Sequence, residues 1–175
     1  VLHGSEIGFA GTIILNPNDR ASIGGMDPAP PPVVPAASVH WDHIVDAPPL
    51  QTRLAEGLAD QDLVLLGVEQ DGSTLRIRYR NDGFRAEAQA LGRAARVLTA
   101  AAPAGVDTFV LEPSREGIPL AAVTIRRADL EQLENTAYAA EALRERAVFA
   151  DAGPRAGLIP VDDPAPELQW GLAPW

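Results

Sequence analysis

The sequence contains no cysteine, and only 3 of its 175 residues are histidine. Without cysteine the chain forms no disulfide bond and offers no thiolate for metal binding or nucleophilic catalysis. His40 and His43, with Asp42 between them, could face a metal ion, but the stretch is proline-rich and offers no further anchor. We therefore predict no metal site, since a stable site usually needs three or four fixed ligands.

Lysine is absent as well, so all 14 basic residues are arginine, and 24 acidic residues outnumber them. The formal net charge is −10. A protein that binds nucleic acid generally needs a basic surface that displaces phosphate counterions, so we predict no nucleic-acid partner. A local patch of arginines for another anionic group is compatible with this charge, because guanidinium groups pair well with carboxylates.

Long apolar runs are also missing. No stretch reaches the roughly 18 apolar residues that a membrane-spanning helix needs. No signal peptide is recognisable after Val1, where a strand-like segment begins at once, and we expect the sequence to be a piece of a larger protein. The lack of cysteine is compatible with a location outside the cytoplasm.

Proline is plentiful, with 16 residues, yet none lies between Leu50 and Pro103. Proline fixes φ and lacks a backbone N–H, so it disfavours helices and central strands. We therefore predict a proline-rich linker at residues 18–47 and a proline-rich tail at residues 153–175 that leads to a following strand. Between them, residues 48–152 are expected to form an α/β domain.

The segment before the linker, residues 1–17, alternates apolar residues with small or polar ones. Ile7, Phe9, Ile13 and Leu15 fall on one face of a strand. Two interpretations stay open. The segment is either a half-buried strand of a soluble sheet or the end of an outer-membrane barrel segment, whose strands have a similar length.

Within the expected domain, apolar periodicity and turn residues predict seven elements. Asp71-Gly72 indicates a hairpin turn, and Asn81-Asp82-Gly83 ends a strand ahead of a helix. The predicted order is α-β-β-α-β-β-α, at residues 50–58, 63–70, 74–80, 84–101, 106–112, 120–126 and 127–143. This order predicts an α+β fold, a two-layer α/β sandwich with a mostly antiparallel four-stranded sheet and helices on one face.

The third predicted element, TLRIRYR, places arginine at every second position. In a sheet with one covered face, alternation points Leu75, Ile77 and Tyr79 toward the helices. The same alternation points the three arginines of this strand toward the other face. These arginines are Arg76, Arg78 and Arg80.

Two roles are open for these arginines. They can form ion pairs with Glu69 or Glu112 on neighbouring strands, which is the interpretation that we favour. They can also form a ridge that binds an anionic partner, either a polysaccharide with uronic acids or an acidic protein surface. Arg126 and Arg127, at the end of the last predicted strand, would then extend the ridge.

No catalytic motif is recognisable. Ser73 and Ser114 lack the glycines of a nucleophile elbow, and Gly24-Gly25 does not lie between a strand and a helix. We therefore predict no catalytic residue, no enzymatic activity and no cofactor. The alternative is a fragment of a carbohydrate-active enzyme whose two carboxylates meet only in the folded chain.

Four stretches resemble the YjbH-like family of exopolysaccharide-biosynthesis outer-membrane proteins, also described as GfcD in capsule operons. These stretches are RYR at Arg78–Arg80, ALGRAARVL at Ala90–Leu98, P-x-x-V-x-x-F at Pro103–Phe109, and the pattern GIPL…TIRRxDL that ends at Leu130. They reflect packing and surface patterns and include no catalytic signature.

The resemblance implies an outer-membrane protein in which β-barrel portions flank a small α/β domain that faces the periplasm. It implies a role in the biosynthesis or export of exopolysaccharide or capsule. The expected partners are the exopolysaccharide or partner export proteins, with the outer membrane reached through the flanking segments. A structural plug or spacer of the barrel is a further alternative.

Overall fold

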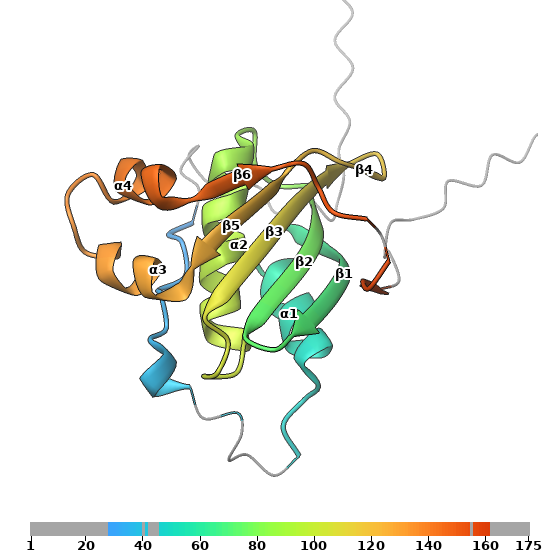
Figure 1. Ribbon diagram of the computed structural model, residues 1–175, viewed down its shortest axis with the longest axis horizontal. Helices are drawn as coiled ribbons and strands as arrows, with labels where there is room; N and C mark the ends of the chain where they lie inside the picture. The colour runs from blue at the N-terminus through green and yellow to red at the C-terminus, as the bar shows by residue number, and fades with distance from the viewer. Residues whose placement is uncertain (1–27, 40, 42–45, 155, 162–175) are drawn as a thin grey trace, which may run out of the picture.

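A computed structural model describes residues 28–39, 41, 46–154 and 156–161 (Figure 1). The strand predicted for residues 1–17 lies outside the described residues, as do residues 162–175 of the predicted tail. The three histidines also lie outside them. No helix in the described part of the chain is both long and apolar enough to cross a membrane.

The described residues form an α+β fold whose helices and strands confirm the predicted mixture. A short 3-10 turn, η2, precedes the main elements at Ala36–Ser38. The elements are α1 (Leu50–Ala59), β1 (Leu63–Asp71), β2 (Thr74–Asn81), α2 (Glu87–Ala101), β3 (Thr108–Arg115), β4 (Ile118–Pro119), β5 (Ala122–Arg126), α3 (Arg127–Leu133), α4 (Ala139–Arg146), β6 (Val148–Ala150) and β7 (Ile159–Pro160). The last predicted helix is divided into α3 and α4, and Tyr138, with φ of +59°, separates them.

The seven strands form one sheet in the order β6-β5-β3-β2-β1-β7, with β4 paired to the end of β3. All pairs are antiparallel except β2 with β3, which run parallel. Helix α2 connects these two strands and returns the chain to the end of the sheet at which β2 began, so β3 must run in the same direction. The predicted four-stranded, mostly antiparallel sheet was therefore too small, and it omitted this parallel pair.

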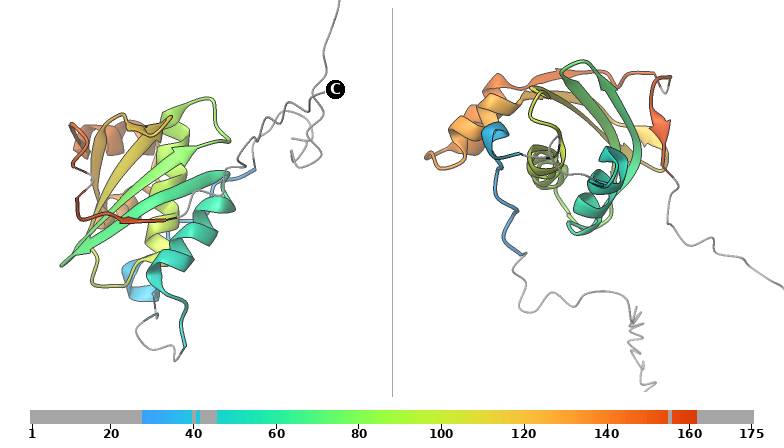
Figure 2. Two further views of the ribbon diagram at one scale, coloured as in Figure 1. Left: turned by 90° about the vertical axis from the view of Figure 1, so that its right-hand side faces the viewer. Right: turned by 90° about the horizontal axis from the view of Figure 1, so that it is seen from below.

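Helices α1 and α2 lie against one face of the sheet, which curves around them (Figure 2). Leu75, Ile77 and Tyr79 on β2 point toward these helices and are fully buried. Leu54 and Leu58, one helical turn apart on α1, are fully buried too. The predicted direction of the apolar residues of β2 is confirmed, because alternating side chains let one strand face the core with every second residue.

The chain before α1 packs on the helices instead of extending freely. The backbone N–H of Val34 donates to Oγ1 of Thr99 on α2 at 2.9 Å. The N–H of Ala36 donates to Oε1 of Glu131 on α3 at 2.8 Å. At the other end of the described chain, β7 pairs with the outer side of β1. The packed unit therefore includes residues on both sides of the range 48–152.

Candidate functional site

The face of the sheet opposite α1 and α2, here called the outer face, carries most of the charged side chains of the strands. Arg76 and Arg78 lie on β2, and Glu112 lies on β3 directly opposite Arg78. These three residues form what we call the buried arginine cluster. Although they point away from the helices, as predicted, Arg78 is only 8% exposed and Glu112 is fully buried.

Glu112 is the centre of the buried arginine cluster. Its carboxylate accepts hydrogen bonds from Nε of Arg76 at 2.9 Å and from Nη2 of Arg78 at 2.7 Å. It also accepts the backbone N–H of Gly153 at 2.8 Å. Arg76 reaches a second carboxylate, Glu69 on β1, through Nη1 at 2.8 Å. The favoured interpretation, ion pairs with neighbouring strands, therefore describes these two arginines.

The ionisation of the cluster follows from these contacts. Burial alone would raise the pKa of Glu112, but the hydrogen bonds from Arg76, Gly153 and Arg78 outweigh it and lower this pKa below its ordinary value. Burial would likewise lower the pKa of Arg76, and its bonds to Glu112 and Glu69 outweigh that effect and raise it. Glu112 and Arg76 are therefore both charged at neutral pH.

Residues 151–154, which we call the strap, cover the cluster. Nη2 of Arg78 donates to the carbonyl oxygen of Gly153 at 3.0 Å, and Nη2 of Arg76 donates to that of Pro154 at 2.6 Å. The two guanidinium groups thus bind the chain's own carboxylates and carbonyls. While the strap is in place, they have little surface to offer an external partner.

The other three predicted arginines lie in different environments. Arg80 is paired with Asp82, from Nε to Oδ1 at 2.7 Å. Arg127 is a correction to the predicted ridge, because it is only 2% exposed and lies on the helix side. Its guanidinium donates to the carbonyl oxygens of Thr99 at 2.6 Å and Pro103 at 2.9 Å, and so holds the end of α2. Of the five arginines, only Arg126 is exposed.

Arg126 lies in a hollow of about 500 Å³ on the outer face, which we call the Arg126 pocket. Strands β3, β5 and β6 and helices α3 and α4 contribute its lining. The lining residues are Thr108, Thr124, Arg126, Asp129, Arg146 and Val148. Sequence reasoning missed all of them except Arg126, although the alternation that points Arg126 outward also points Thr124 outward.

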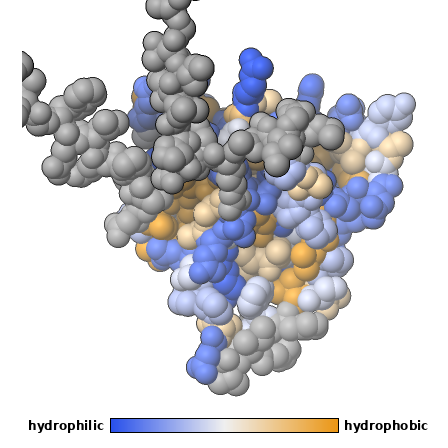
Figure 3. Space-filling model, turned by 180° about the vertical axis from the view of Figure 1, so that it is seen from behind, coloured by the Kyte–Doolittle hydropathy of each residue, from blue (hydrophilic) through white to orange (hydrophobic). Residues whose placement is uncertain are grey.

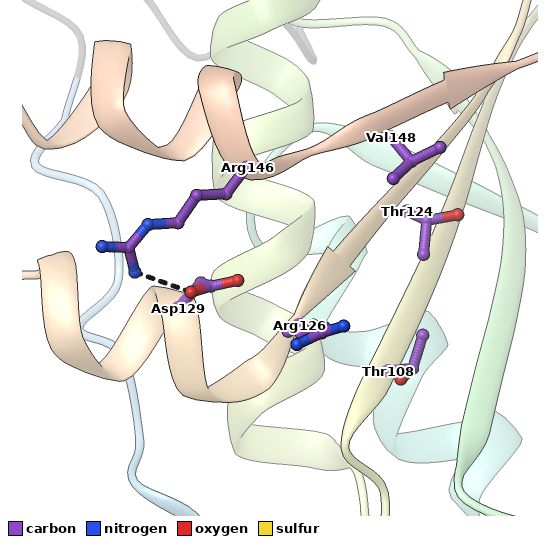
Figure 4. Close-up of a pocket in the computed structure, with 6 residues that line it drawn as sticks. All are labelled: Thr108, Thr124, Arg126, Asp129, Arg146 and Val148. Atoms are coloured by element: carbon purple, nitrogen blue, oxygen red, sulfur yellow. Dashed lines mark hydrogen bonds and ion pairs between the residues drawn. The ribbon is translucent and has the colours of Figure 1, made fainter.

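The charges of the Arg126 pocket are unbalanced. Arg146 is paired with Asp129, from Nη1 to Oδ1 at 2.7 Å, whereas the Arg126 guanidinium makes no hydrogen bond or ion pair with any described residue. Figure 4 shows Arg126 beside Thr108 and Thr124, with the Arg146–Asp129 pair on its other side. A second carboxylate, Asp107, accepts the Thr108 hydroxyl at 2.7 Å from beside the pocket, so the positive charge that is left for a ligand is that of the Arg126 guanidinium itself. The pocket can therefore hold a carboxylate next to neutral hydroxyl groups.

A second hollow, of about 720 Å³, lies on the helix side between α2, α4 and the sheet. We call it the apolar groove, because most of its lining is hydrophobic, including Leu91, Ile125, Leu143 and Phe149. Apolar residues also reach the surface between charged ones on this side of the molecule (Figure 3). The sequence does not predict the groove, since it depends on how far α4 stands from α2.

Comparison with known proteins gives one family. A family model described as "Exopolysaccharide biosynthesis protein YbjH" matches residues 1–174. The match includes the buried arginine cluster, the strap and the Arg126 pocket. Neither the search of curated proteins nor the search of solved structures found a matching protein.

Proposed function

Because the chain belongs to the YjbH family of exopolysaccharide biosynthesis proteins, we propose that it is a non-enzymatic domain that contacts an acidic exopolysaccharide at the Arg126 pocket. The domain faces the periplasm and is attached to the outer membrane by the segments that flank it. The observation that carries the proposal is the exposed Arg126 guanidinium, which makes no ion pair within the described residues.

The chemistry of the pocket suits a sugar acid. A guanidinium group forms two parallel hydrogen bonds with a carboxylate, so Arg126 can orient a uronic acid as well as attract it. Thr124 lies two residues before Arg126 on the same face of β5, and Thr108 lies opposite Arg126 on β3. The Thr124 hydroxyl can exchange hydrogen bonds with the hydroxyls of the sugar, and the Thr108 hydroxyl, which donates to Asp107, can accept one. The pocket is open, so a continuous chain can pass across it.

The overall charge of the protein limits the range of this attraction. A formal net charge of −10 repels an acidic polymer. At physiological ionic strength, charges farther apart than about 8 Å are largely screened, so the local positive charge decides the affinity. At very low ionic strength the repulsion reaches further. We therefore expect binding to be strongest at an intermediate salt concentration.

The acidic residues near the pocket support a binding role over hydrolysis. Cleavage of a glycosidic bond generally needs two carboxyl groups roughly 5 to 10 Å apart, with one of them able to donate a proton. One carboxylate lines the pocket, Asp129, and its oxygen is paired with Arg146. The carboxylate of Asp107, beside the pocket, accepts the hydroxyl of Thr108. Glu112, on the same face, is buried beneath the strap and bonded to two arginines. Its lowered pKa is the opposite of what a general acid needs.

The test is a binding titration with polygalacturonate as the acidic polymer and dextran as the neutral control. Arg126→Ser should weaken binding to polygalacturonate by about tenfold, the usual effect of losing one charge-assisted contact. Arg115→Ser is the matched control, because Arg115 is also exposed but does not line the pocket. Equal affinity for dextran, or equal losses for the two variants, would refute the proposal and favour contact with a partner export protein.

A further inference from the structure

Strand β6 is one edge of the sheet, and no described strand pairs with its outer side. Edge strands in natural proteins usually carry proline or charge, which prevents pairing with another chain. The opposite edge strand, β7, contains Pro160, and the short strand β4 contains Pro119. Strand β6 reads Val148-Phe149-Ala150 and contains neither.

The side chains of β6 are exposed as well. Val148 is 61% exposed and Phe149 is 60% exposed. They point to opposite faces of the sheet, so Val148 borders the Arg126 pocket and Phe149 borders the apolar groove. Leu120, 54% exposed, lines the same groove. Exposed apolar residues that gather at an unpaired edge indicate a surface that is covered by a protein.

We propose that β6 pairs antiparallel with β6 of a second copy of this chain. Two identical antiparallel strands in one sheet are related by a twofold axis perpendicular to the sheet. Directly opposite residues then share a face, and the central register places Phe149 opposite the partner's Phe149. Each aromatic ring would then lie at the mouth of the apolar grooves of both copies. Aromatic residues that face each other across two strands make a favourable pair.

The charges at the two ends of β6 favour the antiparallel arrangement. Arg144 and Arg146 lie in the last turn of α4, just before the strand, and outnumber Glu145 between them. Arg146 is paired with Asp129, so Arg144 is the cation most available to a neighbour. Asp151, which is exposed, follows the strand directly. An antiparallel neighbour brings the arginine end of one copy next to the aspartate end of the other. A parallel neighbour would bring like charges together.

The pairing has a consequence for polymer binding, and this part rests on the proposed function. Because the twofold axis is perpendicular to the sheet, both copies present the outer face on the same side. Val148 belongs both to β6 and to the Arg126 pocket, so the two pockets would flank the new junction. A polymer with repeated carboxylates could then occupy both pockets at once, and its apparent affinity would rise through multivalency.

Self-association is tested first without any polymer, by sedimentation equilibrium of the full chain from low to high micromolar concentration. We expect a reversible dimer, which Phe149→Glu weakens by at least about tenfold, because two carboxylates would face each other across the junction. Ile159→Glu is the matched control, because Ile159 is 59% exposed on the opposite edge strand. A monomer at all concentrations, or a dimer that Phe149→Glu leaves intact, would overturn the proposal.

Crosslinking tests the register. Because the chain has no native cysteine, any disulfide must come from the introduced residue. Opposed residues in an antiparallel pair have Cα atoms about 4.5 to 5.5 Å apart, within the range of a disulfide. Phe149→Cys should therefore form a disulfide-linked dimer under mild oxidation, and Ile159→Cys should remain largely monomeric. Equal crosslinking of the two variants would contradict the assigned edge.

The two proposals can fail separately. Arg126→Ser should leave self-association unchanged, since Arg126 does not lie on β6. Phe149→Glu should leave the affinity for a short uronic-acid oligomer unchanged, because one pocket suffices for it, and should reduce only the affinity for the long polymer. Loss of short-oligomer binding in Phe149→Glu would show that the two sites are not independent and would overturn the bivalent arrangement.

Discussion

The buried arginine cluster predicts a large effect for Glu112→Gln, a change that keeps the shape of the side chain and removes its charge. Five hydrogen bonds from Arg76, Arg78 and Gly153 reach the carboxylate. The glutamine amide would turn its own N–H groups toward the two guanidinium groups. Removing one partner of a buried ion pair typically costs about 3 to 5 kcal/mol. The arginine side chains are 14% and 10% exposed, so some water can replace the carboxylate, and we expect about 3 kcal/mol.

Urea denaturation at neutral pH, followed by circular dichroism, measures this loss. With a typical slope of about 2 kcal/mol per molar urea, the midpoint should fall by about 1.5 M. Glu69→Gln is the matched control, because Glu69 pairs with Arg76 from a side chain that is 31% exposed, and such a pair contributes at most about 1 kcal/mol. Equal losses for the two variants would refute the central role of Glu112.

The pH dependence of stability in the wild type and in Glu112→Gln gives an independent check. The pKa of Glu112 is lower in the folded chain than in the unfolded one, so its stabilisation is present above the unfolded value of about 4.3 and is lost as the pH falls through the folded value. The difference in stability between the wild type and Glu112→Gln should therefore shrink below about pH 4. A difference that stays constant into the acid range would contradict the assigned ionisation.

Two further predictions concern the strap and the core. In Gly153→Ala the new Cβ would lie 2.7 Å from Nη2 of Arg76, so either the guanidinium or the strap must shift and their hydrogen bonds are disturbed. We expect a loss of about 1 kcal/mol in urea denaturation and faster proteolysis of the strap. Burial, with the charge and hydrogen bond of Glu87, raises the pKa of Tyr79 in the folded chain. The stability that the protonated Tyr79 gives the fold is therefore lost as the pH rises above about 10, the ordinary pKa of tyrosine in the unfolded chain. Tyr79→Phe should therefore unfold less steeply with alkaline pH than the wild type, and equal pH profiles would contradict the assignment.

The helices and the four long strands could be predicted from the sequence because each has a local signal. Alternation in β2 identified the residues that face the core, and Asp71-Gly72 marked the turn before that strand. The parallel pairing of β2 and β3 has no local signal, since it depends on the path of α2. Strands β6 and β7 are three and two residues long, too short for any periodicity to be read.

The site was predicted only in part. Arg126 and Arg127 were assigned to one ridge, yet neighbouring residues at the end of a strand point to opposite faces. The alternation along the strand therefore already predicts that Arg127 lies on the helix side of the sheet. The burial of Arg76 and Arg78 could not be read from the sequence, because the strap that covers them follows more than 70 residues later and accepts their hydrogen bonds with backbone carbonyls.

The strap also determines how the domain would respond to force. On the N-terminal side, the carbonyl oxygen of Pro31 accepts a hydrogen bond from Arg96 of α2. On the C-terminal side, the N–H of Val161 donates to the carbonyl oxygen of Leu66 on β1. Tension applied through the two flanking segments would load these attachments and the guanidinium contacts of the strap before it reached the central strands. The arginines of β2 would then act as a mechanical clamp that shields the core when the neighbouring segments are pulled apart.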